Sequence, residues 1–280
     1  MSRPFKSEFV LEEKISEATL KAYHVGFEQN KFRLTPLVDV LVRVIPEFAF
    51  GYQEGSTLLL TDAWDKLRDA ARLIYTSDNY NNRGEFGEIV LHLLLRDFCG
   101  TIPLISKIYF KDNRNSAVKG FDGVHIQICE TLKKLWLGES KIYTNGRSGV
   151  LDLAEDVKKH LKQDYLRSEF SLISTKIPEK IPEREYWIKL LDKHQTLDNI
   201  FGSICVPCVC TYSSNLFKNY QDVTKEYLQD FKKESHKLKS DFDTVNAVTD
   251  VEIILMLLPI ESKKDLVKTL DERLKRAQAI

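Results

Sequence analysis

The chain has 280 residues, which is enough to bury a sizeable core in one large domain or two small ones. Hydrophobic residues make up 43% and charged residues 29%, a composition typical of a globular protein, which excludes a disordered chain. The 41 Lys and Arg residues balance the 41 Asp and Glu residues, so the chain lacks the basic excess of a stand-alone nucleic-acid binder.

No segment predicts a membrane span. The first eight residues contain no apolar core of a secretory signal, and the longest apolar run covers only residues 253–260. A membrane helix needs about 18 apolar residues. We therefore expect a cytoplasmic protein that does not contact a membrane.

The N-terminal part of the chain has weak periodic patterns. Apolar spacing predicts a short helix over residues 37–44, which Pro46 should end, and a second helix that begins near Asp62. A polar loop follows, and it is the best candidate for a boundary. We therefore divide the chain into an α-rich or mixed N-terminal extension, residues 1–78, and a larger domain, residues 79–280.

The larger domain alternates helices and strands. Its first half is predicted as a helix over residues 84–98, strands over 104–111, 118–129 and 132–143, and a helix over 150–166. Its second half is predicted as a helix over residues 183–191, a strand over 200–212, a helix over 216–239, a strand over 252–259 and a helix over 262–277. This alternation indicates an α/β fold with a mixed β-sheet flanked by helices.

Two carboxylates and a lysine lie where apolar side chains are expected. Asp122 has the same strand parity as Val124, so it should point toward the core. Glu139 and Lys141 are two residues apart on the next strand and share the face of the apolar Leu137. A charged side chain on an inward face is costly unless it is paired or binds a cation.

The helix before these strands adds a polar stripe. Glu85, Glu88 and His92 fall within roughly 60° of arc, largely away from the main apolar face. We expect Glu88 to contribute the helix carboxylate, because Glu85 lies in the first turn, where fraying would hold a ligand less rigidly.

This set of residues matches the requirements of phosphodiester hydrolysis. The reaction needs a cation to neutralise phosphate oxygens and an activated water, and Mg²⁺ or Mn²⁺ prefers oxygen ligands. We expect Asp122, Glu139 and Glu88 to hold the metal and Lys141 to orient the water or stabilise developing charge. The same residue types also occur on solvated strands and in ion pairs. The inward parity of three charged residues favours a site.

Two further clusters have alternative interpretations. The basic residues Lys107, Lys111, Arg114 and Lys119 beside the expected site fit a track for nucleic-acid phosphates or an ordinary solvated edge. The three cysteines of residues 205–210 alternate with apolar residues, which favours a buried strand over a zinc site.

The order of helix, strands and charged residues is similar to the PD-(D/E)xK nuclease core, a restriction-endonuclease-like fold. Asp122 takes the place of the Asp, and Glu139-Ser140-Lys141 takes the place of the terminal motif. Phe121 stands where that pattern often has Pro. The segments that carry a closer resemblance, to the HamA family of Hachiman antiphage defence, are Gly84-Glu85-Phe86-Gly87-Glu88, Lys119-Gly120-Phe121-Asp122-Gly123-Val124-His125 and Leu135-Trp136-Leu137-Gly138-Glu139-Ser140-Lys141.

This resemblance implies a metal-dependent DNA nuclease that occupies residues 79–280 and acts under the control of a HamB-like helicase subunit. The chain has no Gly-x-x-x-x-Gly-Lys-Ser/Thr phosphate loop, so an ATP-driven step is expected to belong to another chain. Two alternatives stay open: a catalytically silent regulatory module with a nuclease-like fold, and an RNA nuclease.

Overall fold

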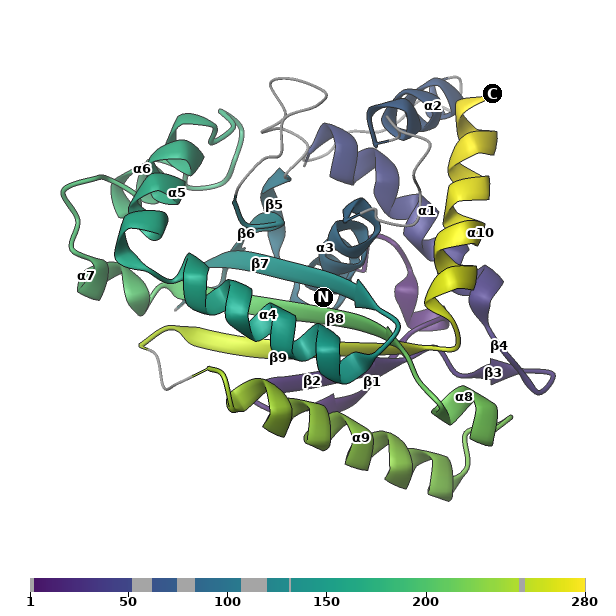
Figure 1. Ribbon diagram of the computed structural model, residues 1–280. Coiled ribbons are helices and arrows are strands. Elements are labelled where there is room, and N and C mark those ends of the chain that lie inside the picture. Colours follow the sequence, from purple (N-terminus) through teal and green to yellow (C-terminus); the bar gives the residue numbers. More distant parts are fainter. Residues whose placement is uncertain are drawn as a thin grey trace.

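A seven-stranded mixed sheet forms the centre of the fold in the computed structural model (Figure 1). The structure describes residues 3–51, 62–74, 84–106, 120–130, 132–246 and 250–279. The strands of the sheet are β1 (Glu12–Ser16), β2 (Leu20–His24), β5 (Ile102–Ser106), β6 (Gly123–Ile128), β7 (Lys133–Tyr143), β8 (Ile204–Ser213) and β9 (Glu252–Ile260). Two short strands, β3 (Phe27–Glu28) and β4 (Lys31–Phe32), pair separately.

The sheet is parallel in its middle and antiparallel at both edges. Its order is β1-β2-β9-β8-β7-β6-β5. Strands β2, β9, β8 and β7 run parallel, whereas β1 pairs antiparallel with β2, and β6 and β5 continue antiparallel from β7. This confirms the predicted mixed sheet.

Helices cover both faces of the sheet (Figure 1). The helices are α1 (Leu34–Phe50), α2 (Ala63–Ile74), α3 (Glu85–Cys99), α4 (Gly146–His160), α5 (Gln163–Thr175), α6 (Arg184–Leu190), α7 (Leu197–Phe201), α8 (Leu216–Asn219), α9 (Lys225–Asp243) and α10 (Lys263–Gln278). Helix α3 packs against β5 to β8, with α1, α2 and α10 on its side of the sheet, and α4 and α9 cover the other face. The order α3, β5, β6, β7, α4 is the one expected of a restriction-endonuclease-like core.

Helix α3 is the most deeply buried helix beside the expected site. Residues 86–95 are all buried, because the sheet covers one side of the helix and α1 the other. Leu91 fits a notch in the sheet at the paired glycines Gly123 and Gly138. A Cβ atom on Gly138 would lie only 2.7 Å from Leu91 Cδ2, so glycine lets α3 approach β7 closely.

The N-terminal residues contribute directly to the central sheet. Strand β2 pairs in parallel with β9, with Leu20 opposite Leu255. Helix α1 shares a hydrophobic cluster with α3 and α10. The expected division between residues 78 and 79 falls in a segment outside the described residues, and it stays a prediction.

One predicted element boundary in the first half of the chain is wrong, and a second lies outside the described residues. Helix α1 does not end at Pro46 but continues to Phe50. Proline costs about 3 kcal/mol inside a helix, and burial of Phe48 and Ala49 on the same face offsets this cost. Strand β5 is described from Ile102 to Ser106, and the predicted end at residue 111 lies beyond the described part.

Two predicted long helices are each broken in two. The helix expected over residues 150–166 is α4 followed by α5, and the helix expected over 216–239 is α8 followed by α9. In the second case Thr224 starts a new helix, since its hydroxyl accepts a hydrogen bond from the Tyr227 amide. The three clustered cysteines lie on β8, all buried and free, which confirms the strand interpretation.

Candidate active site

Asp122 lies where β6 and β7 separate. The ladder between these strands begins at Gly123 opposite Gly138, so β7 extends beyond the start of β6. The Asp122 carboxylate takes the place of the missing strand: its Oδ2 accepts hydrogen bonds from the Ser140 amide at 2.9 Å and the Ser140 hydroxyl at 2.8 Å. Asp122 is thereby held beside the segment Glu139-Ser140-Lys141.

The local backbone fixes this approach. Gly120 has a φ of 142°, a conformation that favours glycine. A Cβ atom at this position would also lie 2.9 Å from Glu169 Oε2. Phe121 follows and is buried, and its ring meets the ring of His160 edge-on at 5.3 Å. The residues that lead to Asp122 therefore contact both α5 and the end of α4.

Glu139 and Lys141 face helix α4. Ser140 points to the opposite face, where Gly87 of α3 packs against it, so its neighbours in β7 point away from α3. Glu139 is only 3% exposed and contacts His160, with 2.5 Å between Oε1 and Nδ1. An ionised carboxylate only accepts hydrogen bonds, so Nδ1 is the donor.

Three successive side chains on this face of β7 each bind a successive turn of α4. Glu139 contacts His160, the Lys141 ammonium lies 2.6 Å from Asp156 Oδ2, and the Tyr143 hydroxyl donates to Asp152 Oδ2 at 2.6 Å. Two residues along a strand advance about 6.7 Å. Four residues along a helix advance about 6 Å. The two repeats match closely enough for all three contacts to form, and we call this set the α4–β7 ladder.

Lys141 is held in its charged form. Burial by itself would lower the pKa of Lys141, but the hydrogen bond and charge of Asp156, with the charges of Asp152 and Asp122, raise it above the usual range. The side chain is 28% exposed, so it reaches both the carboxylates and solvent. An ammonium in this position can stabilise negative charge and is poorly suited to act as a base.

Glu88 occupies a different side of the sheet from Glu139. It is buried on α3, directly after Gly87, which packs against Ser140. The stripe that it shares with His92 leads to a second polar cluster: His92 Nε2 lies 2.9 Å from Glu47 Oε1, and Arg96 donates to both oxygens of Glu47. The structure thus brings Asp122, Glu139 and Lys141 together and places Glu88 on α3, at the other face of the sheet from Glu139.

Sequence reasoning missed several residues beside these side chains. The sequence indicates no role for His160, Asp156 and Asp152 beyond their place in a predicted helix, although their four-residue spacing predicts one shared face. Ser140 was only the middle residue of the motif. Glu47, the partner of His92 and Arg96, gave no signal because it is distant in sequence.

The basic residues Lys107, Lys111, Arg114 and Lys119 lie outside the described residues, so the phosphate track stays a prediction.

Within the described ranges, no group of three or more His, Cys, Asp or Glu side chains is arranged to hold a metal ion. None of the helices described there is long and apolar enough to cross a membrane.

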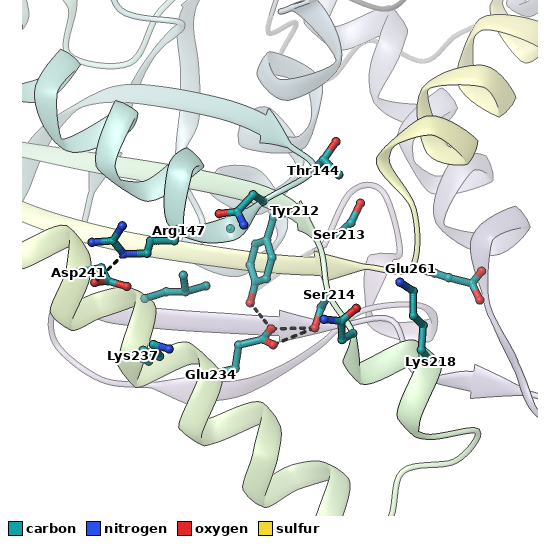
Figure 2. Close-up of a pocket in the computed structure, with 14 residues that line it drawn as sticks. Thr144, Arg147, Tyr212, Ser213, Ser214, Lys218, Glu234, Lys237, Asp241 and Glu261 are labelled. Carbon is teal, nitrogen blue, oxygen red and sulfur yellow. Dashed lines mark hydrogen bonds and ion pairs between the residues drawn. The ribbon is translucent and has the colours of Figure 1, made fainter.

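A separate hollow of about 500 Å³ lies where β7 and β8 end (Figure 2). Its floor is polar, since the Tyr212 and Ser214 hydroxyls both donate to Glu234, and Arg147 pairs with Asp241. The lining has three basic and three acidic side chains: Arg147, Lys218, Lys237, Glu234, Asp241 and Glu261. Its charges balance, and it does not include Asp122, Glu139, Lys141 or Glu88.

Fold and site together define a mixed α/β protein, consistent with a nuclease-like core, in which two buried carboxylates and a lysine gather where β6 and β7 separate. The chain belongs to the HamA family, whose family model matches residues 3–274. Membership of this family connects the chain with antiphage defence. A search of curated proteins found no match.

Proposed function

We propose that this protein is a metal-dependent DNA nuclease subunit of an antiphage defence system. The observation that carries the proposal is the approach of Asp122 to Glu139-Ser140-Lys141, made by two hydrogen bonds to Ser140. These two carboxylates and the lysine come from neighbouring strands that separate at this point. The family supports the role in defence.

The donor set fits a divalent cation of the hard type. Mg²⁺ is usually bound by one or two carboxylates, with water and substrate phosphate oxygens completing the shell, rather than by a full protein cage. Asp122 and Glu139 provide such a pair in positions where a buried charge otherwise needs compensation.

Each residue then has a defined part in cleavage. Held by Asp122 and Glu139, Mg²⁺ or Mn²⁺ would neutralise the non-bridging oxygens of the scissile phosphate. Ser140 fixes the orientation of Asp122. Lys141, kept cationic by Asp156, stabilises the negative charge that develops during attack. Glu88, which is buried on α3, would contribute a water-mediated ligand from that side of the sheet.

We further propose that a HamB-like helicase subunit controls this activity. The chain has no net charge, so it is expected to bind DNA weakly by itself. The two segments that we expect to bind the partner, within residues 1–78 and along residues 216–239, contact each other: His236 Nε2 lies 3.0 Å from Glu17 Oε1. They therefore offer one continuous surface, which lies outside residues 84–141.

The test is to incubate the purified chain with plasmid DNA, and separately with structured RNA, with Mg²⁺, Mn²⁺ or EDTA. The co-encoded helicase is added or omitted. We expect divalent-dependent DNA cleavage that the helicase changes. Cleavage of RNA alone would make the protein an RNA nuclease, and intact DNA and RNA under all conditions, helicase included, would contradict the nuclease proposal.

A further inference from the structure

Helix α4 contacts strand β7 at Glu139 and Lys141, the two β7 side chains that take part in the proposed reaction. The α4–β7 ladder joins His160 to Glu139 and Asp156 to Lys141. We propose that His160 and Asp156 are positioning residues: His160 orients Glu139 toward the metal, and Asp156 holds Lys141 toward the phosphate. This inference rests on the proposed function.

The surroundings of His160 support a fixed hydrogen-bond donor rather than a mobile surface residue. Its ring stacks on Tyr165, with centroids 4.4 Å apart and planes 12° apart, and Phe121 meets it edge-on. These two rings set the plane of the imidazole, and therefore the direction of its Nδ1. That nitrogen reaches Oε1 of a nearly fully buried Glu139. A metal-binding carboxylate is commonly oriented by a hydrogen bond of this kind.

Asp156 has a different effect on Lys141. Lysine side chains are flexible, and an ammonium near two carboxylates of the site could fold back onto them. The short contact with Asp156 draws the Lys141 ammonium toward α4, with Asp152 3.7 Å away as a weaker second partner. Lys141 is thus kept near Asp122 and Glu139 without neutralising the metal-binding pair.

The ladder contains its own control. Tyr143 and Asp152 form the third contact in the same geometry, but neither belongs to the proposed catalytic set. Loss of the Tyr143 hydroxyl removes one contact of the ladder and leaves Glu139 and Lys141 with their partners. A purely structural ladder would respond similarly to the loss of any contact, whereas a positioning ladder would not.

The experiment compares four variants of the full chain. His160→Phe keeps a ring between Tyr165 and Phe121 but has no donor. His160→Asn loses the ring and keeps an N–H near the Nδ1 position. Asp156→Asn weakens the hold on Lys141, and Tyr143→Phe is the control. The measurements are Mn²⁺ affinity by calorimetry, cleavage rate and the midpoint of thermal unfolding.

We expect His160→Phe to weaken Mn²⁺ binding by about tenfold or more, while His160→Asn stays within about threefold of the wild type. Asp156→Asn should slow cleavage by about tenfold with unchanged Mn²⁺ affinity, because Lys141 is not a ligand. Tyr143→Phe should change neither. Weak binding in His160→Asn with normal binding in His160→Phe would show that the ring only packs, and it would overturn the assignment of His160. Unchanged cleavage in Asp156→Asn would overturn that of Asp156.

The same experiment separates this inference from the proposed function. Wild-type protein that binds Mn²⁺ and cleaves DNA, together with variants that all behave as the control does, would leave the nuclease in place and overturn the positioning roles. Wild-type protein that neither binds Mn²⁺ nor cleaves nucleic acid would contradict the proposed function, and the positioning roles would fall with it.

Discussion

Ser140 donates two hydrogen bonds to a single oxygen of Asp122, one from its amide and one from its hydroxyl. Without Asp122, the Ser140 amide would have no strand opposite it, because the pairing of β6 with β7 does not extend past Gly123 and Gly138. The middle residue of Glu139-Ser140-Lys141 therefore joins the two carboxylates of the candidate site. A side chain without a hydroxyl cannot do this as well.

Ser140→Ala removes the hydrogen bond from the hydroxyl and leaves the hydrogen bond from the backbone amide. A hydrogen bond to a charged group contributes about 1.5–3 kcal/mol, so we expect the free energy of unfolding in urea to fall by this amount. Cleavage should slow by about tenfold because Asp122 is less firmly held. Ser106→Ala is the control, since its hydroxyl donates to the Phe48 carbonyl away from the site. A Ser140→Ala variant that is destabilised but cleaves normally would argue against this role.

The two carboxylates at the start of α3 should differ in importance. Glu88 is buried and follows Gly87 at the contact with Ser140, whereas Glu85 is only partly buried in the first turn. We expect Glu88→Gln to slow cleavage more than Glu85→Gln does in a side-by-side assay. The reverse ranking would assign the helix carboxylate to Glu85.

Gly138→Ala tests the close packing of α3 on the sheet. The added methyl group would overlap Leu91, whose Cδ atoms would lie 2.7 and 2.9 Å from it. Overpacking of this kind costs about 1–3 kcal/mol, which is measurable by urea unfolding. Because the conflict is with one side chain, Leu91→Val combined with Gly138→Ala should be less destabilised than the sum of the single variants. Additive losses would show that the backbone, and not Leu91, limits this contact.

Stability should fall in mild acid because of His125. Burial, with the nearby charges of His92 and Arg96, holds the pKa of His125 well below its usual range. Below about pH 6.5 the unfolded chain binds a proton at His125 that the folded chain excludes. The free energy of unfolding should therefore decrease as pH falls from about 6.5 toward the folded pKa, by up to about 1.4 kcal/mol per unit.

His125→Asn removes this titration and leaves an amide that can bond to Thr101, which His125 Nδ1 contacts at 2.8 Å. Urea unfolding of both proteins between pH 7 and pH 5 gives the comparison. The wild type should lose more stability over this range than the variant. Parallel curves would mean that His125 does not contribute to acid sensitivity.

The sequence predicted the elements with strong periodicity and could not predict contacts between distant segments. Alternation in residues 133–143 correctly indicates a strand with Glu139 inward, because parity decides which face a side chain takes. Strand β2 was missed, since it is short and its place depends on pairing with β9, more than 200 residues later. The helix break before Thr224 was missed because the charged residues on both sides fit one continuous helix.

For the site, strand parity predicts that Asp122 and Glu139 are buried, but it does not predict which residues contact them. The partner of Glu139 is His160, and its position depends on where α4 begins and how it crosses β7. Similarly, His92 was grouped with Glu88 by helical spacing, although its contact is with Glu47 on another helix. Such partners are set by tertiary packing, which periodicity within one segment does not contain.

The most direct test of the central claim is metal-dependent cleavage by the wild type, Glu139→Ala and Lys141→Ala, each with the helicase present. Neither substitution opens an apolar cavity, so the circular dichroism spectrum and thermal unfolding should show folded protein in all three cases. We predict that both variants lose cleavage, that Glu139→Ala also loses Mn²⁺ binding in calorimetry, and that Lys141→Ala retains it. Cleavage at the wild-type rate by either folded variant would contradict the assignment of this site.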